Sequence, residues 1–343
     1  MPLLLDTARS GSTVGLRGRN CLTIGLVNNM PDAACEATER QFLDLIRAVT
    51  SDVIVCLKLF LIPEVPRADK VRERIAARYR DIAELWDTHL DGLIVTGNEP
   101  RAVRMEDEPY WPALAKLVDW ARDNTASTIW SCLAAHAAVL RADGIERRLL
   151  EDKLCGVFDF ETVADHPLLA GVTPRLWVPH SRVNDLPEPA LRSSGYRVLS
   201  SSAAAGVDTF IREQQGSSLF VFFQGHPEYE IDSLLREYRR DVGRFLRGER
   251  ENYPGVPQGY FNDDATVVAN DFRTWAMGDR GANLVADFPM EALEAGVENT
   301  WRRSAIGVYQ NWIDRLKDRK TQRRSPSDFG RRSRRNASRM SAG

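Results

Sequence analysis

The chain has 343 residues, and its 46 Lys and Arg nearly balance its 48 Asp and Glu, giving a formal net charge of −2. Apolar residues make up 43% of the chain, enough to bury a sizeable core, which excludes a wholly disordered protein. The longest apolar run, residues 53–62, is interrupted by Lys58 and is far shorter than the roughly 20 residues that a membrane-spanning helix needs. The run at residues 3–5 is too short for the core of a signal peptide, so we expect a cytoplasmic protein that does not enter a membrane.

Apolar, strand-like runs alternate with helix-like segments through the first half of the chain. In one such segment, Leu114, Leu117, Val118 and Ala121 recur with the spacing of a single helix face. Four strand–helix units in succession predict an α/β fold in which helices flank a mostly parallel sheet. In chain order, the expected elements are a strand at 22–27, a helix at 36–49, a strand at 53–62, a helical stretch through Ile75, Ile82 and Leu85, a strand at 92–97, a helix at 110–122, a strand at 128–130 and a helix at 134–141.

The second half adds short apolar strands near residues 196–199, 209–212 and 219–223, followed by a helix over about residues 230–246. No internal repeat divides the chain. We therefore expect these segments to belong to the same compact α/β domain as the first half.

This domain is expected over residues 19–316, with residues 262–299 as an appended, irregular insertion and residues 1–18 as a loose N-terminal segment. The stretch 315–343 contains eleven Lys or Arg and two Asp or Glu, a charge of +9. Because it has almost no apolar residues, we expect a disordered basic tail over residues 317–343. Its charges do not alternate with aromatic residues in a pattern for base stacking, so no specific nucleic-acid binding is expected.

The five cysteines form no CxxC pair, and their odd number fits neither a disulfide framework nor a structural zinc site. The five histidines show no metal-ligand spacing either, so we expect no metal. Cys132 differs from the other cysteines because it stands between an apolar strand and an Ala-rich helix. A nucleophile at such an elbow is exposed, the following backbone N–H can stabilise an oxyanion, and the helix N-terminus favours the thiolate. The alternative interpretation is a buried cysteine at a strand end.

A second polar motif follows the strand predicted at 219–223, where Gln224-Gly225-His226-Pro227-Glu228-Tyr229 begins. Glu228 can orient the imidazole of His226, which then takes a proton from a nucleophile. Since the carboxyl ends of parallel strands meet at one edge of a sheet, we expect Cys132, His226 and Glu228 to form a catalytic triad. This arrangement resembles the class I glutamine amidotransferase-like superfamily. The alternative is a structural histidine beside a surface glutamate.

Further motifs are similar to those of the homoserine O-acyltransferase, or homoserine transsuccinylase, family from about residue 21 to residue 316, with one insertion. Each motif by itself is modest, but together and in this order they are specific. The matching motifs are Gly25-Leu26-Val27-Asn28-Asn29-Met30-Pro31, Gly92-Leu93-Ile94-Val95-Thr96-Gly97, Tyr110-Trp111, Cys132, Gly156-Val157-Phe158, His166-Pro167-Leu168-Leu169, Pro179-His180-Ser181-Arg182, Gly225-His226-Pro227-Glu228-Tyr229, Arg240-Asp241, Tyr260-Phe261, Thr300-Trp301-Arg302 and Asn311-Trp312.

The resemblance implies a ping-pong acyl transfer from an acyl-CoA to homoserine, in a homodimeric enzyme of methionine biosynthesis. It implies no cofactor, since acyl-CoA is a co-substrate. Cys132 would hold the acyl group, and His226, oriented by Glu228, would act as base and acid. The oxyanion would lie near the backbone N–H of Leu133 and the loop after Gly97.

The resemblance also implies positions that bind substrate. Arg240 matches the position that binds the carboxylate of the amino acid, a bidentate task that suits a guanidinium. Arg182 matches another arginine on the substrate side. Either arginine could instead pair with a nearby acid such as Asp241.

One position bears on the choice of acyl donor. After Thr96-Gly97, the family tends to show a small residue in succinyl users and Glu in acetyl users. Counted without gaps, this position is Arg101, whose charge could pair with the distal carboxylate of succinyl-CoA. We therefore expect a succinyl donor, and the alternative is an arginine that only faces solvent.

Two departures from the family pattern affect the site. The family usually has Trp-Gly-Ala-Gln after its cysteine, whereas this chain has residues 133–136 as Leu-Ala-Ala-His, which removes a glycine from the elbow. His136 is interpreted as a packed helix histidine and not as a second base. After Met30-Pro31 the family commonly carries Lys, and this chain has Asp32 there, so a positive charge near the oxyanion is expected to be missing.

Three other functions stay open at this point. The first keeps the chemistry and changes a substrate, giving a homoserine O-acetyltransferase or an acyltransferase for serine or another hydroxy amino acid. The second is a glutamine amidotransferase-type hydrolase, although Ser131 and Leu133 replace the glycines that flank its cysteine. The third is a non-catalytic protein that binds a CoA ester or an amino acid, which would not require a complete triad.

Overall fold

The computed structural model describes residues 3–8, 21–50, 52–213 and 216–323. Within them the larger sheet has nine strands, in the order β1 (Leu3–Asp6), β3 (Ile54–Leu61), β2 (Cys21–Val27), β5 (Gly92–Val95), β6 (Ser127–Ser131), β13 (Leu219–Phe223), β12 (Thr209–Arg212) and β9 (Arg197–Val198), with β4 (Arg80–Asp81) paired to the end of β3. The strands from β1 to β13 pair in parallel, whereas β12 and β9 extend the sheet antiparallel. The mostly parallel sheet predicted from the sequence is confirmed, with an antiparallel edge added.

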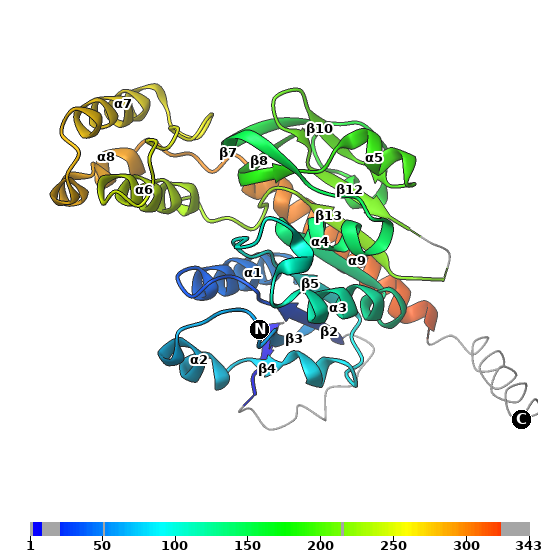
Figure 1. Cartoon of the computed structure of the whole chain (residues 1–343). Coiled ribbons are helices and arrows are strands. Elements are labelled where there is room, and N and C mark those ends of the chain that lie inside the picture. Colours follow the sequence, from blue (N-terminus) through cyan, green and yellow to red (C-terminus); the bar gives the residue numbers. More distant parts are fainter. Residues whose placement is uncertain (1–2, 9–20, 51, 214–215, 324–343) are drawn as a thin grey trace, which may run out of the picture.

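Helices cover both faces of this sheet, as the alternation of strands and helices predicts (Figure 1). One face packs against α1 (Cys35–Val49) and α9 (Arg302–Arg323). The other face packs against α3 (Trp111–Asn124) and α4 (Leu133–Asp143). The α/β class with helices on both faces is therefore confirmed.

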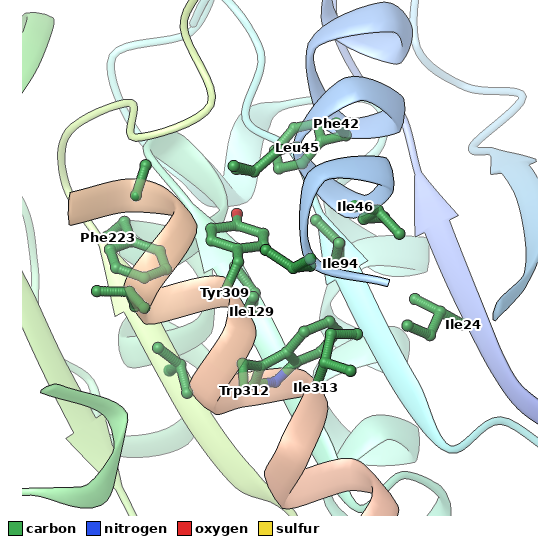
Figure 2. Close-up of a cluster of buried hydrophobic side chains, with 14 of the residues drawn as sticks. Ile24, Phe42, Leu45, Ile46, Ile94, Ile129, Phe223, Tyr309, Trp312 and Ile313 are labelled. Carbon is green, nitrogen blue, oxygen red and sulfur yellow. The ribbon is translucent and has the colours of Figure 1, made fainter. Parts of the chain in front are cut away.

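The buried cluster under α1 and α9 joins segments that are far apart in the sequence (Figure 2). Ile24, Ile94 and Ile129 come from the adjacent strands β2, β5 and β6, and each is fully or almost fully buried. Trp312 of α9 packs on the same cluster and donates its Nε1–H to Ser127 Oγ at 2.9 Å. Each buried isoleucine contributes about 1.5–3 kcal/mol relative to an exposed one. The sheet is thus a rigid base for the loops at its carboxyl edge.

A second, four-stranded antiparallel sheet is not predicted by the sequence analysis. In order, its strands are β11 (Gly206–Val207), β10 (Ser200–Ser202), β7 (Arg148–Thr162) and β8 (Arg175–Asp185), and α5 (Glu188–Ser193) follows β8 in the chain. The β7–β8 pair is irregular between Leu149 and Leu154. That part of β7 is rich in charged residues, so the apolar alternation that marks a half-buried strand is absent from it.

Residues 262–299 form helices, so the expectation of an irregular insertion is wrong. Their helices α7 (Asp263–Gly278) and α8 (Met290–Glu294) pack with α6 (Ser233–Leu246) around a separate apolar cluster, which projects from the body of the molecule (Figure 1). The side chain of Asn262 caps α7 by accepting a backbone N–H at 2.9 Å. Because the buried face of α7 consists of three alanines and one phenylalanine, its apolar periodicity is weak in the sequence.

The two ends of the domain are more regular than expected. Residues 3–6, assigned to a loose segment, form β1 beside β3, where the buried Asp6 makes ion pairs at 2.7 and 2.8 Å with two basic side chains. Residues 317–323, assigned to a disordered tail, continue helix α9. Both expectations are wrong for these residues. The remainder of the two segments lies mostly outside the described residues.

The helical stretch predicted before residue 92 is interrupted. It divides into α2 (Asp69–Ala76), the short strand β4 and a 3₁₀ turn at Ile82–Leu85. Across the described ranges, no helix combines the length and the apolar character needed to cross a membrane.

Candidate active site

Cys132 occupies a sharp turn between β6 and α4, where its position at a strand end predicts an elbow. Its φ and ψ are 53° and −118°, and no other non-glycine residue in the described ranges has a positive φ. Such a conformation costs about 1–3 kcal/mol and persists only where the surroundings impose it. The N–H of Cys132 donates to the carbonyl of Phe223 at 2.8 Å, and its carbonyl accepts from the N–H of Ala135 at 2.9 Å. These bonds hold the strained turn and leave the thiol partly exposed.

The two positions proposed to hold an oxyanion are brought together at this elbow. The N–H of Leu133 stands in the first turn of α4, where helical N–H groups have no acceptor within the helix. Gly97 lies beside it, because a Cβ added to Gly97 would stand 2.8 Å from the backbone nitrogen of Leu133 and 3.1 Å from its Cβ. A larger residue at Gly97 would therefore displace the elbow or cover this N–H.

Two residues that the sequence analysis gave no role hold the Gly97 loop in place. Asn29, which follows β2, donates its backbone N–H to Thr96 Oγ1 at 2.8 Å and its side-chain amide to the Thr96 carbonyl at 3.1 Å. Both residues are buried. The ends of the adjacent strands β2 and β5 are thereby tied together just before Gly97. The signal for this in the sequence is the Asn28-Asn29 pair, which served only as a family motif.

His226 and Glu228 lie in the turn after β13, beside the elbow. His226 Nδ1 lies 2.9 Å from Glu228 Oε1, and both side chains are buried. The side chain of Cys132 is close enough to the imidazole to raise the pKa of His226. Because Nδ1 faces the carboxylate, Nε2 is left for the thiol. Ser131 donates its hydroxyl to the same Oε1 at 3.4 Å. The structure thus brings Cys132, His226 and Glu228 together as predicted, because β6 and β13 are paired neighbours.

The groups beside the imidazole of His226 favour its protonated form. Burial lowers the pKa of His226, but Cys132 and Glu228 outweigh burial, so the pKa of His226 is raised well above its ordinary value. A protonated imidazole in turn stabilises the thiolate of the cysteine that faces it. The ring of Tyr229 stacks on the imidazole with centroids 4.3 Å apart and planes 14° apart, which covers it from water. The site has the composition of a cysteine nucleophile with its base and an orienting carboxylate.

Helix α6 carries a carboxylate and a guanidinium close to this triad. Tyr229, the residue stacked on His226, donates its hydroxyl to Glu237 Oε1 at 2.6 Å. Arg240 lies 3.7 Å from the other oxygen of Glu237, and its Nε donates to Asp241 Oδ1 at 3.0 Å. The pairing of Arg240 with Asp241, considered as an alternative to substrate binding, is therefore observed. The side chain of Arg240 is still 41% exposed, so it has donors available to a ligand.

Two residues of the second sheet complete this polar cluster and were not singled out from the sequence. Lys153 of β7 pairs with Asp241 at 2.8 Å and lies 3.7 Å from Glu237. Burial lowers the pKa of Lys153, but the charges of Glu237 and Asp241 outweigh burial, so the net shift is upward. Ser181 of β8 donates its hydroxyl to Glu237. The sequence carried no signal for Lys153 because only the long-range pairing of β7 with β8 brings it here.

Arg182, expected on the substrate side, has its guanidinium inside the protein. Its side chain is 3% exposed and pairs with Asp185 at 2.9 Å. It also donates to His180 Nδ1 at 3.3 Å and to the carbonyls of Asn184 and Ala205 at 2.8 and 2.6 Å. These partners use all three guanidinium nitrogens, so the geometry favours an internal role over the binding of substrate.

Arg101 lies exposed in the loop that follows Gly97. The buried carboxylate of Glu108 accepts the backbone N–H groups of Arg101 and Ala102 at 2.6 and 2.8 Å, which sets the shape of the loop. Arg244 of α6 pairs with Glu99 of the same loop at 3.2 Å. The loop therefore lies beside the helix that carries Arg240, with the Arg101 side chain open to solvent.

His136 is a packed helix histidine, as interpreted from the sequence. It is buried, and its Nε2 lies 3.1 Å from Gln224 Oε1. Burial, with the charge of Arg182, lowers the pKa of His136 to about 3, so this ring is neutral. The four alanines around it on α4 are also buried, which lets this helix pack tightly under the elbow.

The family model described as homoserine O-succinyltransferase matches residues 15–323. The chain belongs to this family. A homoserine O-succinyltransferase of Rhodopseudomonas palustris is 51% identical over 292 residues, 85% of this chain and 87% of the relative. One of Methylorubrum extorquens is 48% identical over 298 residues, 87% of this chain and 88% of the relative. The family suggested by the sequence motifs is therefore confirmed.

The solved structures that match this chain share less of its sequence than these relatives do. A glutamine amidotransferase from Methylobacillus flagellatus has a TM-score of 0.48 and 16% identity, over 87% of this chain and 95% of that chain. A glutamine amidotransferase from Thermotoga maritima has a TM-score of 0.43 and 11% identity, over 86% of this chain and 98% of that chain.

Proposed function

We propose that this chain is a homoserine O-succinyltransferase, which transfers succinyl from succinyl-CoA through a thioester on Cys132 to the hydroxyl of L-homoserine. The observation that carries the proposal is that the turn with the hydrogen-bonded pair His226 and Glu228 follows β13, the strand paired with β6, which ends at the strained elbow of Cys132. The curated relatives described above carry the same activity in their names, which favours a succinyl over an acetyl donor.

In the first half-reaction, the Cys132 sulfur, whose proton is held on His226 Nε2, attacks the thioester carbon of succinyl-CoA. The carbonyl oxygen becomes an oxyanion beside the N–H of Leu133 and the loop at Gly97. When the intermediate collapses, the C–S bond to CoA breaks and the protonated His226 returns its proton to the CoA sulfur. A succinyl thioester on Cys132 and free CoA remain.

In the second half-reaction, His226 Nε2 takes the proton of the homoserine hydroxyl, whose oxygen attacks the thioester carbon on Cys132. Collapse of this intermediate breaks the C–S bond to the enzyme and restores the ion pair between the Cys132 sulfur and His226. Glu228 holds Nδ1 throughout and stabilises the imidazolium in both steps. Every proton moves between His226 and a substrate or the thiol, so we propose that the reaction needs no cofactor.

Homoserine itself is a zwitterion. The polar cluster formed by Glu237 and Arg240 of α6, with Lys153 and Ser181, offers it groups of both charges. We propose that Arg240 binds its carboxylate and that Glu237 binds its ammonium group. Lys153 and Ser181 then hold Glu237 in place. The support for this assignment is that Tyr229 connects Glu237 to the imidazole of His226. A substrate held there presents its hydroxyl to the base.

The distal carboxylate of the succinyl group needs a positive partner or water. We propose that Arg101 supplies that partner, because its loop follows Gly97 at the elbow and its backbone is held by Glu108. An exposed arginine contributes a modest attraction, so it selects between donors more than it binds either one.

We also propose that the chain acts as a homodimer, as the family resemblance implies. Strands β7 and β8 carry exposed apolar side chains, with Leu149, Trp177 and Val183 exposed by 74%, 42% and 39%. Such a surface is typical of a protein interface. Sedimentation equilibrium tests it, and a species of one chain at all concentrations would exclude it.

The decisive experiment mixes the purified protein with succinyl-CoA or acetyl-CoA, with and without homoserine, and follows the release of free CoA thiol. Release that depends on homoserine and prefers succinyl-CoA is the expected result. Acyl-enzyme that forms but does not react with homoserine would move the search to serine and other hydroxy amino acids. If neither ester is cleaved and no adduct forms on Cys132, the transferase proposal fails, and glutamine hydrolysis becomes the next activity to assay.

A further inference from the structure

Behind the catalytic histidine lies a second, fully buried polar network that the reaction above does not use. It consists of Arg182, His180 and Asp208, and it ends on the backbone of Gly225, the residue before His226. The side chains of His180 and Asp208 are 0% and 1% exposed. A buried ion or polar group at such a position is costly unless it is well paired, so the network calls for a physical explanation.

The carboxylate of Asp208 is the centre of this network. Its Oδ1 accepts the N–H of Gly225 at 2.8 Å, and its Oδ2 accepts the hydroxyl of Thr209 at 2.7 Å. The backbone carbonyl of Asp208 accepts the N–H of Gln224 at 3.2 Å. Asp208 therefore holds two successive peptide groups of the turn that carries His226.

His180 places a polar nitrogen against the same carboxylate. Arg182 donates its Nε–H to His180 Nδ1, so Nδ1 is an acceptor and the proton of the neutral ring stays on Nε2. Nε2 lies 3.5 Å from Asp208 Oδ1, with no hydrogen bond of its own within the described residues. Burial, with the charge of Arg182, holds the pKa of His180 well below its ordinary value, which keeps the ring neutral. The ring of His180 stacks on the ring of Phe160, with the two centroids 5.1 Å apart, which restricts its rotation.

The contact requires a glycine at position 225. A Cβ there would stand 2.7 Å from His180 Nε2, 2.9 Å from Asp208 Oδ1 and 2.6 Å from a methyl group of Val178. The Gly225 backbone thus lies directly against the two polar side chains. This close approach gives the glycine of the Gly225-His226-Pro227-Glu228 motif a specific purpose.

We infer that Asp208, with His180 and Arg182 behind it, positions the imidazole of His226 for proton transfer with Cys132. The inference rests on the proposed role of His226 as the base. Asp208 fixes the Gly225 N–H, and the carbonyl of Pro179 fixes the next N–H, that of His226, at 2.8 Å. The network holds the main chain, whereas Glu228 holds the ring. This assigns Arg182 a positioning role in place of the substrate contact expected from the sequence.

The test uses a readout that does not depend on the identity of the substrate. Iodoacetamide alkylates the thiolate form of a cysteine, and a protonated imidazole beside the sulfur favours that form. The quantity measured is the ratio of the alkylation rate of Cys132 at pH 6.5 to that at pH 9.5, with the modified residue identified by mass spectrometry. In Asp208→Ala we expect this ratio to fall about tenfold, because a loosened turn misplaces the base. In Asp208→Asn, which keeps one acceptor oxygen, we expect a smaller fall.

A matched control separates positioning from stability. Asp91→Ala removes the buried carboxylate that accepts another backbone N–H, that of Thr23 at 2.8 Å, before the first residue of β5 and outside the network around Asp208. We expect Asp91→Ala to lower the melting temperature and leave the alkylation ratio unchanged. If Asp208→Ala also lowers only the melting temperature, Asp208 is merely structural and the inference is overturned. If Asp208→Ala does not fold, an unchanged ratio in Asp208→Asn overturns the inference in the same way.

Turnover gives a second check, which tests the proposed function separately. With succinyl-CoA and homoserine, we expect Asp208→Ala to lower kcat about 10–100-fold while the KM for homoserine changes by less than about threefold. A raised KM with unchanged kcat would contradict a positioning role. If the wild-type protein transfers no succinyl group, the proposed function fails, while the alkylation ratios still decide whether Asp208 positions His226.

Discussion

The triad at the elbow and the polar cluster on α6 are neighbours, yet they are built in opposite ways. In the triad, His226 and Glu228 are buried and hydrogen-bonded to each other, and Cys132 is held in a strained conformation by the strands beside it. On α6, the side chain of Arg240 is 41% exposed and forms ion pairs with two carboxylates, those of Glu237 and Asp241.

The difference separates two tasks. Groups that move protons need a geometry that exists before substrate arrives, because reorganisation during the reaction slows it. Groups that bind a charged substrate need partners that can be exchanged for it at little cost, and half-exposed ion pairs are worth little by themselves. Substitutions at the elbow should therefore affect kcat, and substitutions on α6 should affect KM.

The largest effect is expected at the nucleophile. Cys132→Ala should abolish the acyl-enzyme and lower turnover by at least about 10⁴-fold, because it removes the sulfur that forms the proposed thioester. Intact-protein mass spectrometry after addition of succinyl-CoA measures the adduct. Cys155→Ala, at the other partly exposed cysteine, is the control and should keep both adduct and turnover. An adduct that survives Cys132→Ala would place the nucleophile elsewhere.

The orienting carboxylate should come next. Glu228→Gln keeps the shape of the side chain and one acceptor oxygen but removes the negative charge that faces His226 Nδ1. We expect kcat to fall about 10²–10⁴-fold with little change in the KM for homoserine. Ser131→Ala removes only the long bond of 3.4 Å to the same carboxylate and should cost far less. Equal losses in the two variants would mean that Glu228 does not orient the base.

On α6, the expected effect is on binding. Arg240→Lys keeps the charge and loses the planar fork, so we expect the KM for homoserine to rise about 10–100-fold while acyl-enzyme forms at the normal rate. Arg239→Lys changes the adjacent exposed arginine and should leave KM unchanged. Steady-state kinetics and a single-turnover measurement with succinyl-CoA separate the two steps. Slower acyl-enzyme formation with a normal KM would move Arg240 into the chemistry of the triad.

A smaller effect is expected at the loop that follows Gly97. Arg101→Glu reverses the charge proposed to face the distal carboxylate of the donor, so the preference for succinyl-CoA over acetyl-CoA should fall about tenfold. The measurement is the ratio of kcat/KM for the two donors. Arg104→Glu makes the same charge change at an exposed position of the same loop and is the control. If both variants lose the same amount on both donors, Arg101 does not recognise the acyl group.

The smallest effect concerns stability at the base of α6, where Glu230 bridges Arg40 of α1 and Arg236 of α6. Hydrogen bonds from Arg40, with Arg236, lower the pKa of Glu230 to about 2. Since the pKa is lower in the folded state, the stabilisation is present above the ordinary pKa and is lost as the pH falls toward 2.

Glu230→Gln should therefore cost about 1 kcal/mol of unfolding free energy at pH 7 and almost nothing near pH 2. Urea unfolding of both proteins across this pH range measures it. A difference that stays constant with pH would show that the bridge acts through packing and not through charge.

Much of the large sheet could be predicted because its signals are local. The strands β2, β5, β6 and β13 are buried on both sides and show as continuous apolar runs, and α3 shows one apolar face. The second sheet could not be predicted, because β7 has charged residues in its first half and acquires its partner β8 only through a long-range pairing.

The residues of the candidate site also fall into two groups, those with a local signal in the sequence and those without one. Cys132, His226 and Glu228 could be found because they lie in turns that follow buried strands, and Gly97 because it follows β5. Lys153, Ser181 and Glu237 are brought together from different elements, and no spacing in the chain indicates it.

From the order of its residues alone, this chain specifies an α/β sheet, a cysteine at a strand end and a histidine–glutamate pair at the end of another strand of the same sheet. Those properties depend on the pattern of apolar and turn-forming residues within a few positions of the chain, and this pattern can be read without knowing the fold. Whether an arginine faces substrate or the core depends on partners that folding brings from elsewhere. Arg182 and Arg240 look alike as motif residues, and only the packing of β8, β11 and α6 made the first internal and left the second open.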